Sequence, residues 1–202
     1  MKAAHLLLAG LLSTSATTLL AASIQPTPEP GLWISESTTL INGVDMQAKM
    51  LEVRQNMLAG MPEEQRAMAE KMMNDAEEAG HRRCINAELA KKMTDPETLL
   101  ADAREQMPGC DLQVDQKDDD QLEFHGNCAN SEGFNGDLSG DMQMVSSKEM
   151  RSNFLGEGTY QLPAQAAGAL GEEFNGPVKV EHKETSKWVG SDCGDTPVEP
   201  LS

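Results

Sequence analysis

Alternation of apolar and polar positions predicts several strands along the chain. Residues 31–41, GLWISESTTLI, alternate and are rich in β-branched side chains, which is typical of a strand. Later segments show the same period of two, at residues 110–114, 121–128, 134–145, 150–158 and 178–190. Short turns join most of them, so the pattern predicts an antiparallel meander.

The stretch between the first strand and the others predicts helices. Residues 45–79 lack β-branched runs and are rich in Ala, Glu, Met, Gln and Lys, all good helix formers. Gly60-Met61-Pro62 divides this stretch into two helices, and Gly80 closes the second. Two shorter helices are predicted at residues 85–93 and 95–107, with Asn86 and Asp95 as their N-caps.

This order of elements predicts an α+β fold that is mostly antiparallel β. We expect a curved meander or open barrel-like sheet, with a Met-rich helical hairpin and short helices on one side. The expected divisions are a signal peptide at 1–23, a Pro-rich linker at 24–30, a single disulfide-stapled β-rich domain at 31–194 and a disordered tail at 195–202.

The first residues have the three parts of a secretory signal. Lys2 is followed by an apolar run from Leu6 to Leu12 and by Ala21-Ala22-Ser23, which suits a cleavage site. The apolar run is too short for a membrane anchor, and no other segment is apolar enough to cross a bilayer. These features predict bacterial export to the periplasm or the medium.

Four cysteines remain after the expected cleavage: Cys84, Cys110, Cys128 and Cys193. In an exported protein an even number of cysteines predicts disulfides, here two with three possible connectivities. A four-cysteine zinc site is the alternative, but no C-x-x-C pair favours it.

The hairpin pattern favours one of these connectivities. If Cys110 faces Cys128, then Leu112 faces Gly126, and all four side chains lie on one buried side. We therefore expect a Cys110–Cys128 bridge and a second bridge between Cys84 and Cys193. The other pairings stay open, because connectivity does not follow from sequence alone.

Charge and composition restrict the partners and the core. The formal net charge of −17 repels phosphate backbones, so we expect no nucleic-acid partner. Aromatic residues make up 3% of the chain, so the core must rely on Leu, Val, Ala and Met. The length suits one domain, and we expect a monomer.

Several motifs, in their order along the chain, resemble a known family. They are EPGLW, the Met-rich MPEEQRAMAEKMM, RRCINAELAKK, the Cys-flanked hairpin, the strand GDLSGDMQM and the terminal KWVGSDC. In this order they resemble the exported bacterial proteins grouped as domain of unknown function family 3617, over about residues 29–194. The resemblance implies a periplasmic or secreted, mostly β domain with no established activity and no catalytic residues. Residues 163–177 depart from the family pattern, because they are less β-like.

Methionines form the most unusual pattern. Met46, Met50, Met57, Met61, Met68 and Met72 follow one another at spacings of 4, 7, 4, 7 and 4 residues. In an unbroken helix this repeat forms one stripe, which we expect to pack dry against the sheet. It would also suit a pliant cover over an apolar small molecule such as an acyl chain. The candidate cover residues are Met50, Met57, Met61, Met68 and Met72.

Other chemistry is less well supported. Thioethers are soft ligands, so a periplasmic Cu(I) buffer is one alternative function. An unrecognised hydrolase is the other alternative function, although no nucleophile or phosphate-binding motif occurs. His81, His125 and His182 are not at metal-binding spacings, and the alternation around His182 predicts an inward-facing core histidine. The acidic residues 115–120 predict a solvated turn.

The sequence therefore favours an exported, non-catalytic binding or envelope-interaction module. We expect no resident metal or cofactor.

Overall fold

The computed structural model describes residues 23–129, 133–161, 171 and 174–198. Within these ranges the strands are β1 (Gly31–Ile41), β2 (Val44–Asp45), β3 (Arg82–Ile85), β4 (Cys110–Asp118), β5 (Gln121–Cys128), β6 (Phe134–Ser146), β7 (Glu149–Tyr160) and β8 (Gly176–Gly190). The helices are α1 (Met46–Ala59), α2 (Glu63–Gly80), α3 (Ala87–Lys92) and α4 (Pro96–Gln106). The predicted α+β, mostly antiparallel β class is confirmed. Apart from Ser23, the predicted signal peptide lies outside the described residues.

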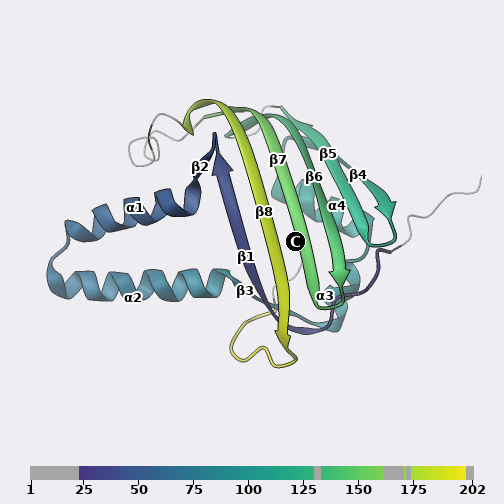
Figure 1. Cartoon of the computed structure of the whole chain (residues 1–202), viewed down its shortest axis with the longest axis horizontal. Coiled ribbons are helices and arrows are strands. Elements are labelled where there is room, and N and C mark those ends of the chain that lie inside the picture. Colours follow the sequence, from purple (N-terminus) through teal and green to yellow (C-terminus); the bar gives the residue numbers. More distant parts are fainter. Residues whose placement is uncertain (1–22, 130–132, 162–170, 172–173, 199–202) are drawn as a thin grey trace, which may run out of the picture.

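All the strands pair antiparallel in one open sheet. The order is β2-β1-β8-β7-β6-β5-β4, and β3 pairs with the beginning of β1. The run from β4 to β8 is the predicted meander, and the long β8 then brings the last strand beside the first (Figure 1). Their ladder extends from Ile41 opposite Val180 to Leu32 opposite Gly190, with a register shift between Leu32 and Trp33.

Both predicted disulfides are present. Cys110 lies opposite Cys128 and Leu112 opposite Gly126, so the predicted hairpin register is confirmed. The second bridge joins Cys84 in β3 to Cys193, which follows β8. It ties together segments 109 residues apart in the sequence.

Helices α3 and α4 lie against one face of the sheet, which we call the inner face (Figure 1). Asp95 caps α4 by accepting a hydrogen bond from the backbone N–H of Glu97. Leu100 of α4 packs with Leu112 and Leu138 of the sheet. Arg104 of α4 also donates a 2.6 Å hydrogen bond to the carbonyl oxygen of Leu112, so this helix is fixed to β4.

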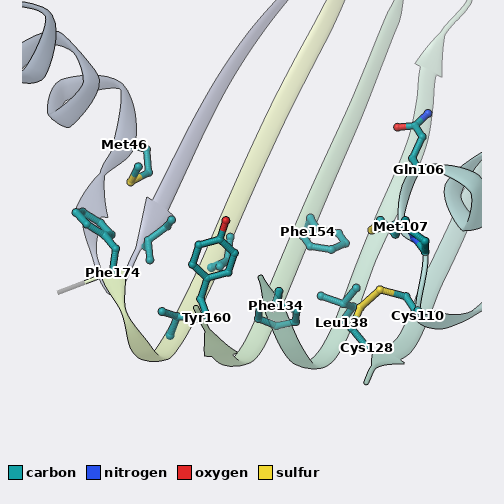
Figure 2. A pocket seen from close by; sticks show the side chains of 16 residues that line it. Met46, Gln106, Met107, Cys110, Cys128, Phe134, Leu138, Phe154, Tyr160 and Phe174 are labelled. Atoms are coloured by element: carbon teal, nitrogen blue, oxygen red, sulfur yellow. A yellow bond between two sulfur atoms is a disulfide. The ribbon is translucent and has the colours of Figure 1, made fainter. Parts of the chain in front are cut away.

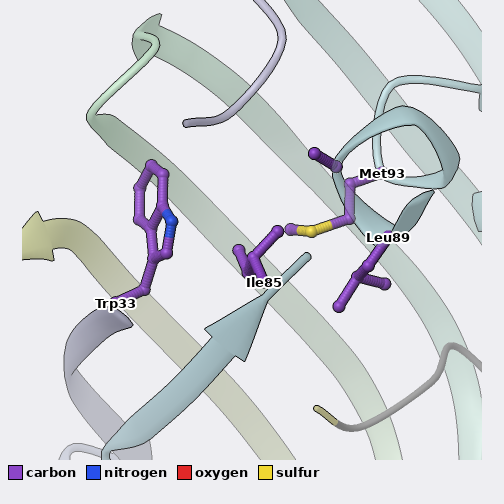
Figure 3. Close-up of a cluster of buried hydrophobic side chains, with 5 residues drawn as sticks. Trp33, Ile85, Leu89 and Met93 are labelled. Carbon is purple, nitrogen blue, oxygen red and sulfur yellow. The ribbon is translucent and has the colours of Figure 1, made fainter. Parts of the chain in front are cut away.

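The core at the far end of the inner face forms around Trp33. Figure 3 shows its ring beside Ile85, with Leu89 of α3 and Met93, which follows α3, in the same cluster. Its indole nitrogen donates to the carbonyl oxygen of Glu29, so the buried polar group is satisfied. The short α3 is thereby attached to the sheet although it has few turns of its own.

Two residues of the predicted linker 24–30, Ile24 and Pro28, are buried. Ile24 is fully buried against Leu122 and Met144, and its backbone N–H donates to the carbonyl oxygen of Thr94. A Pro-rich extended segment can present apolar side chains to a sheet, and the composition alone did not distinguish that role from a spacer. In the predicted tail, Val198 forms an isolated β-bridge with Cys84, and residues 199–202 lie outside the described ranges.

The other two helices leave the sheet. Figure 1 shows α1 and α2 as an antiparallel hairpin that projects beyond the β1 edge. Leu58 is the only buried residue of α1, and α2 has none. The predicted Met-rich hairpin is therefore present, and it extends beyond the edge of the sheet and covers little of either face. Among the described residues, no helix combines the length and the apolar character that crossing a membrane requires.

Candidate functional site

A cavity of about 800 Å³ opens on the inner face, where β1, β5 and β7 end and β4, β6 and β8 begin. Its lining is mostly apolar. Figure 2 shows Phe134, Phe154, Tyr160 and Phe174 around it. Aliphatic side chains complete the wall: Ile41, Leu138, Val178 and Val180.

Strand alternation explains how these residues meet. Leu138, Gly156, Val180 and Ile41 are successive cross-strand neighbours on β6, β7, β8 and β1. Side chains directly opposite each other in an antiparallel ladder lie on the same face, so all four positions face inward. Gly156 has no side chain, and the ring of Phe134 and the side chain of Leu138 occupy the space beside it.

The disulfide hairpin and the end of α4 form one wall. Cys110 and Cys128 both line the cavity, together with Met107 and Pro108, which follow α4. Because the bridge joins the beginning of β4 to the end of β5, it holds this wall in place. A structural disulfide therefore also shapes the candidate site.

The opposite wall includes the beginning of α1. Asp45 caps this helix by accepting hydrogen bonds from the backbone N–H groups of Gln47 and Ala48. The next residue, Met46, lines the cavity (Figure 2). Of the predicted methionine stripe, it is the member that reaches the site.

The five candidate cover methionines are not at the cavity. Met50, Met57, Met61, Met68 and Met72 are absent from its lining, and the exposed fractions of Met68 and Met72 are 69% and 67%. The prediction that the stripe packs dry against the sheet is wrong.

The break between the two helices explains this error. A repeat of eleven residues makes one stripe only if the helix continues, and the chain reverses at residues 60–62. Arg66 fixes the reversal by donating to the carbonyl oxygens of Leu58 and Met61, and Arg54 pairs with Glu77 across the hairpin. The hairpin is therefore held together mainly by polar contacts, and Met50, Met57, Met68 and Met72 are exposed to water.

The three histidines lie in different places. His125 is on the other face of the sheet, 3.5 Å from Asp115, and His81 follows α2. His182 faces inward, as predicted, and its Nδ1 shares a 2.8 Å hydrogen bond with Oγ1 of Thr39. Its side chain keeps an exposed fraction of 31%, so it is a partly accessible group on the inner face.

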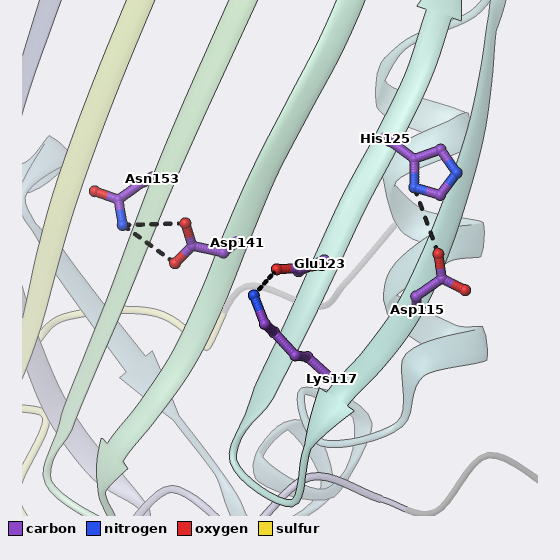
Figure 4. Close-up of polar contacts among 6 residues, drawn as sticks. All are labelled: Asp115, Lys117, Glu123, His125, Asp141 and Asn153. Carbon is purple, nitrogen blue, oxygen red and sulfur yellow. Dashed lines mark hydrogen bonds and ion pairs between the residues drawn. The ribbon is translucent and has the colours of Figure 1, made fainter.

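The outer face is polar. Figure 4 shows Asn153 donating to Asp141, and Lys117 paired with Glu123. The hydrogen bond and the negative charge of Glu123 raise the pKa of Lys117 above its ordinary value. These groups are exposed and mutually paired, and such pairs add little to stability. Among the described residues, no group of three or more His, Cys, Asp or Glu side chains is placed to hold a metal ion.

The cavity residues were missed by the sequence reasoning, although composition held a signal. The chain has four phenylalanines and one tyrosine, and three of the phenylalanines and the tyrosine line the cavity. Aromatic residues are scarce in this chain, so their gathering at one place indicates a candidate site more strongly than the frequent methionines do.

Comparison with known proteins gives a family and no activity. No curated protein matches the chain, and no solved structure does. The family model described as "Protein of unknown function (DUF3617)" matches residues 28–193, which includes every strand of the sheet and the whole cavity wall. The chain therefore belongs to the DUF3617 family of proteins of unknown function.

Proposed function

We propose that this protein is an exported, non-catalytic binding module that holds an apolar small molecule in the inner-face cavity. The observation that carries the proposal is the concentration of aromatic side chains there, in a chain with 3% aromatic residues. Ligand sites are typically concave and lined by apolar and aromatic groups, as this one is.

The size of the cavity suits a small-molecule ligand. A volume of about 800 Å³ lies in the upper part of the range for small-molecule sites. An alkyl chain of moderate length would fill such a space and remove its apolar wall from water.

Export is part of the proposal. The N-terminal residues have the pattern of a cleavable secretory signal, and all four cysteines are paired. Disulfides persist in oxidising compartments such as the periplasm. The ligand would then be a molecule that the protein meets outside the cytoplasm.

A titration with an uncharged apolar fluorophore, N-phenyl-1-naphthylamine, tests the proposal. We expect saturable binding with a blue-shifted emission. The Val180→Phe variant should bind the fluorophore about tenfold more weakly or worse, because the new ring occupies the cavity. Val189→Phe is the matched control, since Val189 is on the same strand, outside the cavity lining and 51% exposed. Equal affinities for the two variants would overturn the proposal.

A second candidate function is a Cu(I) buffer, and the exposure of the hairpin methionines favours it. Met68 and Met72 lie one helical turn apart on α2, and both thioethers are open to solvent. Native mass spectrometry with Cu(I) added tests this function. A stoichiometric copper adduct that is lost in Met68→Leu/Met72→Leu would support it, and no adduct would exclude it.

A further inference from the structure

A row of polar side chains crosses the inner face beside the cavity. Thr39 of β1 is hydrogen bonded to His182 of β8, and Nε2 of His182 lies 3.7 Å from Oε2 of Glu184. The other oxygen of Glu184 accepts a 2.9 Å hydrogen bond from Ser186, and Ser186 is 2.7 Å from the hydroxyl of Ser35. We call Thr39, His182 and Glu184 the polar cluster.

This cluster continues the cavity wall. Ile41 opposite Val180 lines the cavity, and the next inward-facing pair along the same two strands is Thr39 opposite His182. Two residues of a strand span about 7 Å. The third partner in that row is Phe154, opposite His182, and its ring also lines the cavity. A molecule that extends from the cavity along β1 and β8 therefore meets the cluster first.

The cluster has unused hydrogen-bonding capacity. The 3.7 Å separation of Nε2 of His182 and Oε2 of Glu184 is longer than a hydrogen bond, so both atoms keep capacity to hydrogen bond to a ligand beside them. An ionised carboxylate has about four acceptor sites, and Ser186 is the hydrogen-bond donor found for Glu184. The exposed fractions of the His182 and Glu184 side chains are 31% and 34%, so both remain accessible.

We infer that the ligand is a single-chain amphiphile whose uncharged or cationic, hydrogen-bond-donating head group binds the polar cluster while its alkyl chain fills the cavity. This inference rests on the proposed function. A hydroxyl or ammonium head donates to Glu184, whereas a carboxylate head is repelled by it. The site thus selects fatty alcohols, monoacylglycerols or alkylamines over fatty acids.

Arg83 is an inner-face cation close to β1 that could favour an anionic head, and its position separates it from the cluster. It lies opposite Trp33, and its Nε is buried without a hydrogen-bond partner. Trp33 is six residues from Thr39 along β1, a distance of about 20 Å in an extended strand. Arg83 therefore does not offset the negative charge of Glu184 at the head-group position.

Three ligands of equal chain length test the inference, 1-decanol, decylammonium and decanoate, each by displacement of N-phenyl-1-naphthylamine at neutral pH. The wild type should bind the alcohol and the ammonium about tenfold more tightly than the carboxylate. In Glu184→Gln the fluorophore should bind as in the wild type, decylammonium should bind about tenfold more weakly, and the discrimination against decanoate should disappear.

Glu181→Gln is the matched control, because Glu181 is on the outer face of the same strand and pairs with Lys179. It should behave as the wild type with all three ligands. If the wild type binds the fluorophore but does not discriminate between the heads, or if Glu184→Gln keeps the discrimination, the inference fails while the proposed function stands. If the fluorophore does not bind at all, the proposed function fails first.

A hydrolytic role of the polar cluster must also be tested, because the cluster holds a hydroxyl, an imidazole and a carboxylate. A monodecanoyl glycerol incubated with the protein should be recovered intact, because a binding site only retains it. Release of decanoate that is abolished in Thr39→Val would contradict the binding role of the cluster.

Discussion

Leu138 and Gly156 lie directly opposite each other on β6 and β7 at the floor of the cavity, and the missing side chain of Gly156 leaves room for Leu138 and for the ring of Phe134. A Cβ at position 156 would lie 3.2 Å from Cζ of Phe134 and 3.3 Å from Cδ2 of Leu138. The packing of Phe134 and Leu138 at the cavity floor therefore depends on a residue without a side chain.

The Gly156→Ala variant tests this dependence. Phe134 and Leu138 must move by a few tenths of an ångström, so we expect the free energy of unfolding to fall by about 1 kcal/mol. The fluorophore should also bind more weakly. Urea unfolding and the titration measure the two effects. Gly80→Ala is the control, because nothing lies near a Cβ there and the residue ends a helix, so it should be neutral or stabilising. A stabilised Gly156→Ala would contradict the account.

The two disulfides should separate stability from binding. Replacing Cys84 and Cys193 with Ala opens a bridge across 109 residues, which should lower the free energy of unfolding by about 5 kcal/mol. Replacing Cys110 and Cys128 opens a bridge across 18 residues, which should cost about 3 kcal/mol. Only the second change alters the cavity wall, so under native conditions it should be the one that weakens fluorophore binding. If both variants fold and the loss of the Cys84–Cys193 bridge weakens fluorophore binding more than the loss of the Cys110–Cys128 bridge, the role of the second bridge in the cavity wall is refuted.

Oxidation by dilute hydrogen peroxide should divide the methionines by exposure. Met50, Met68 and Met72 should form sulfoxide at the rate of a free peptide, because their exposed fractions are 54%, 69% and 67%. Met93 and Met144 are 3% and 1% exposed and should react only through unfolding. Peptide mass mapping over time gives the rates. Protection of Met68 to the level of Met144 would show that another surface covers the hairpin.

Ile24 should stabilise the domain as a core residue. Its side chain is fully buried against Leu122 and Met144, so Ile24→Ala should lower the free energy of unfolding by about 3 kcal/mol. Val198→Ala is a comparison at the other end of the described chain, where the side chain is 43% exposed and the change should be within about 0.5 kcal/mol. Thermal or urea unfolding provides the measurement. An Ile24 variant as stable as the wild type would restore the linker interpretation.

The parts of the fold that local patterns encode were predictable. The Cys110–Cys128 hairpin has a period of two on both strands and a short turn, so its register follows from the sequence. The caps at Asn86 and Asp95 and the break at residues 60–62 are also local signals, and they were correct.

The site was not predictable, because it depends on pairings between distant residues. Thr39 and His182 are 143 residues apart, and their contact exists only because β8 returns to β1. Helical propensity likewise says that residues 46–80 form helices but not which surface they pack on, so the projection of the hairpin could not be foreseen.

Photo-crosslinking with an alkyl diazirine probe of about ten carbons, followed by peptide mapping, tests the central claim most directly. We predict that the labelled residues fall on the cavity wall, in the peptides that contain Phe134, Tyr160 and Val178–Val180. Unlabelled 1-decanol in excess should compete with this labelling. Labelling confined to the α1–α2 hairpin around Met57 and Met68 would contradict the claim, because the apolar ligand would then lie outside the sheet.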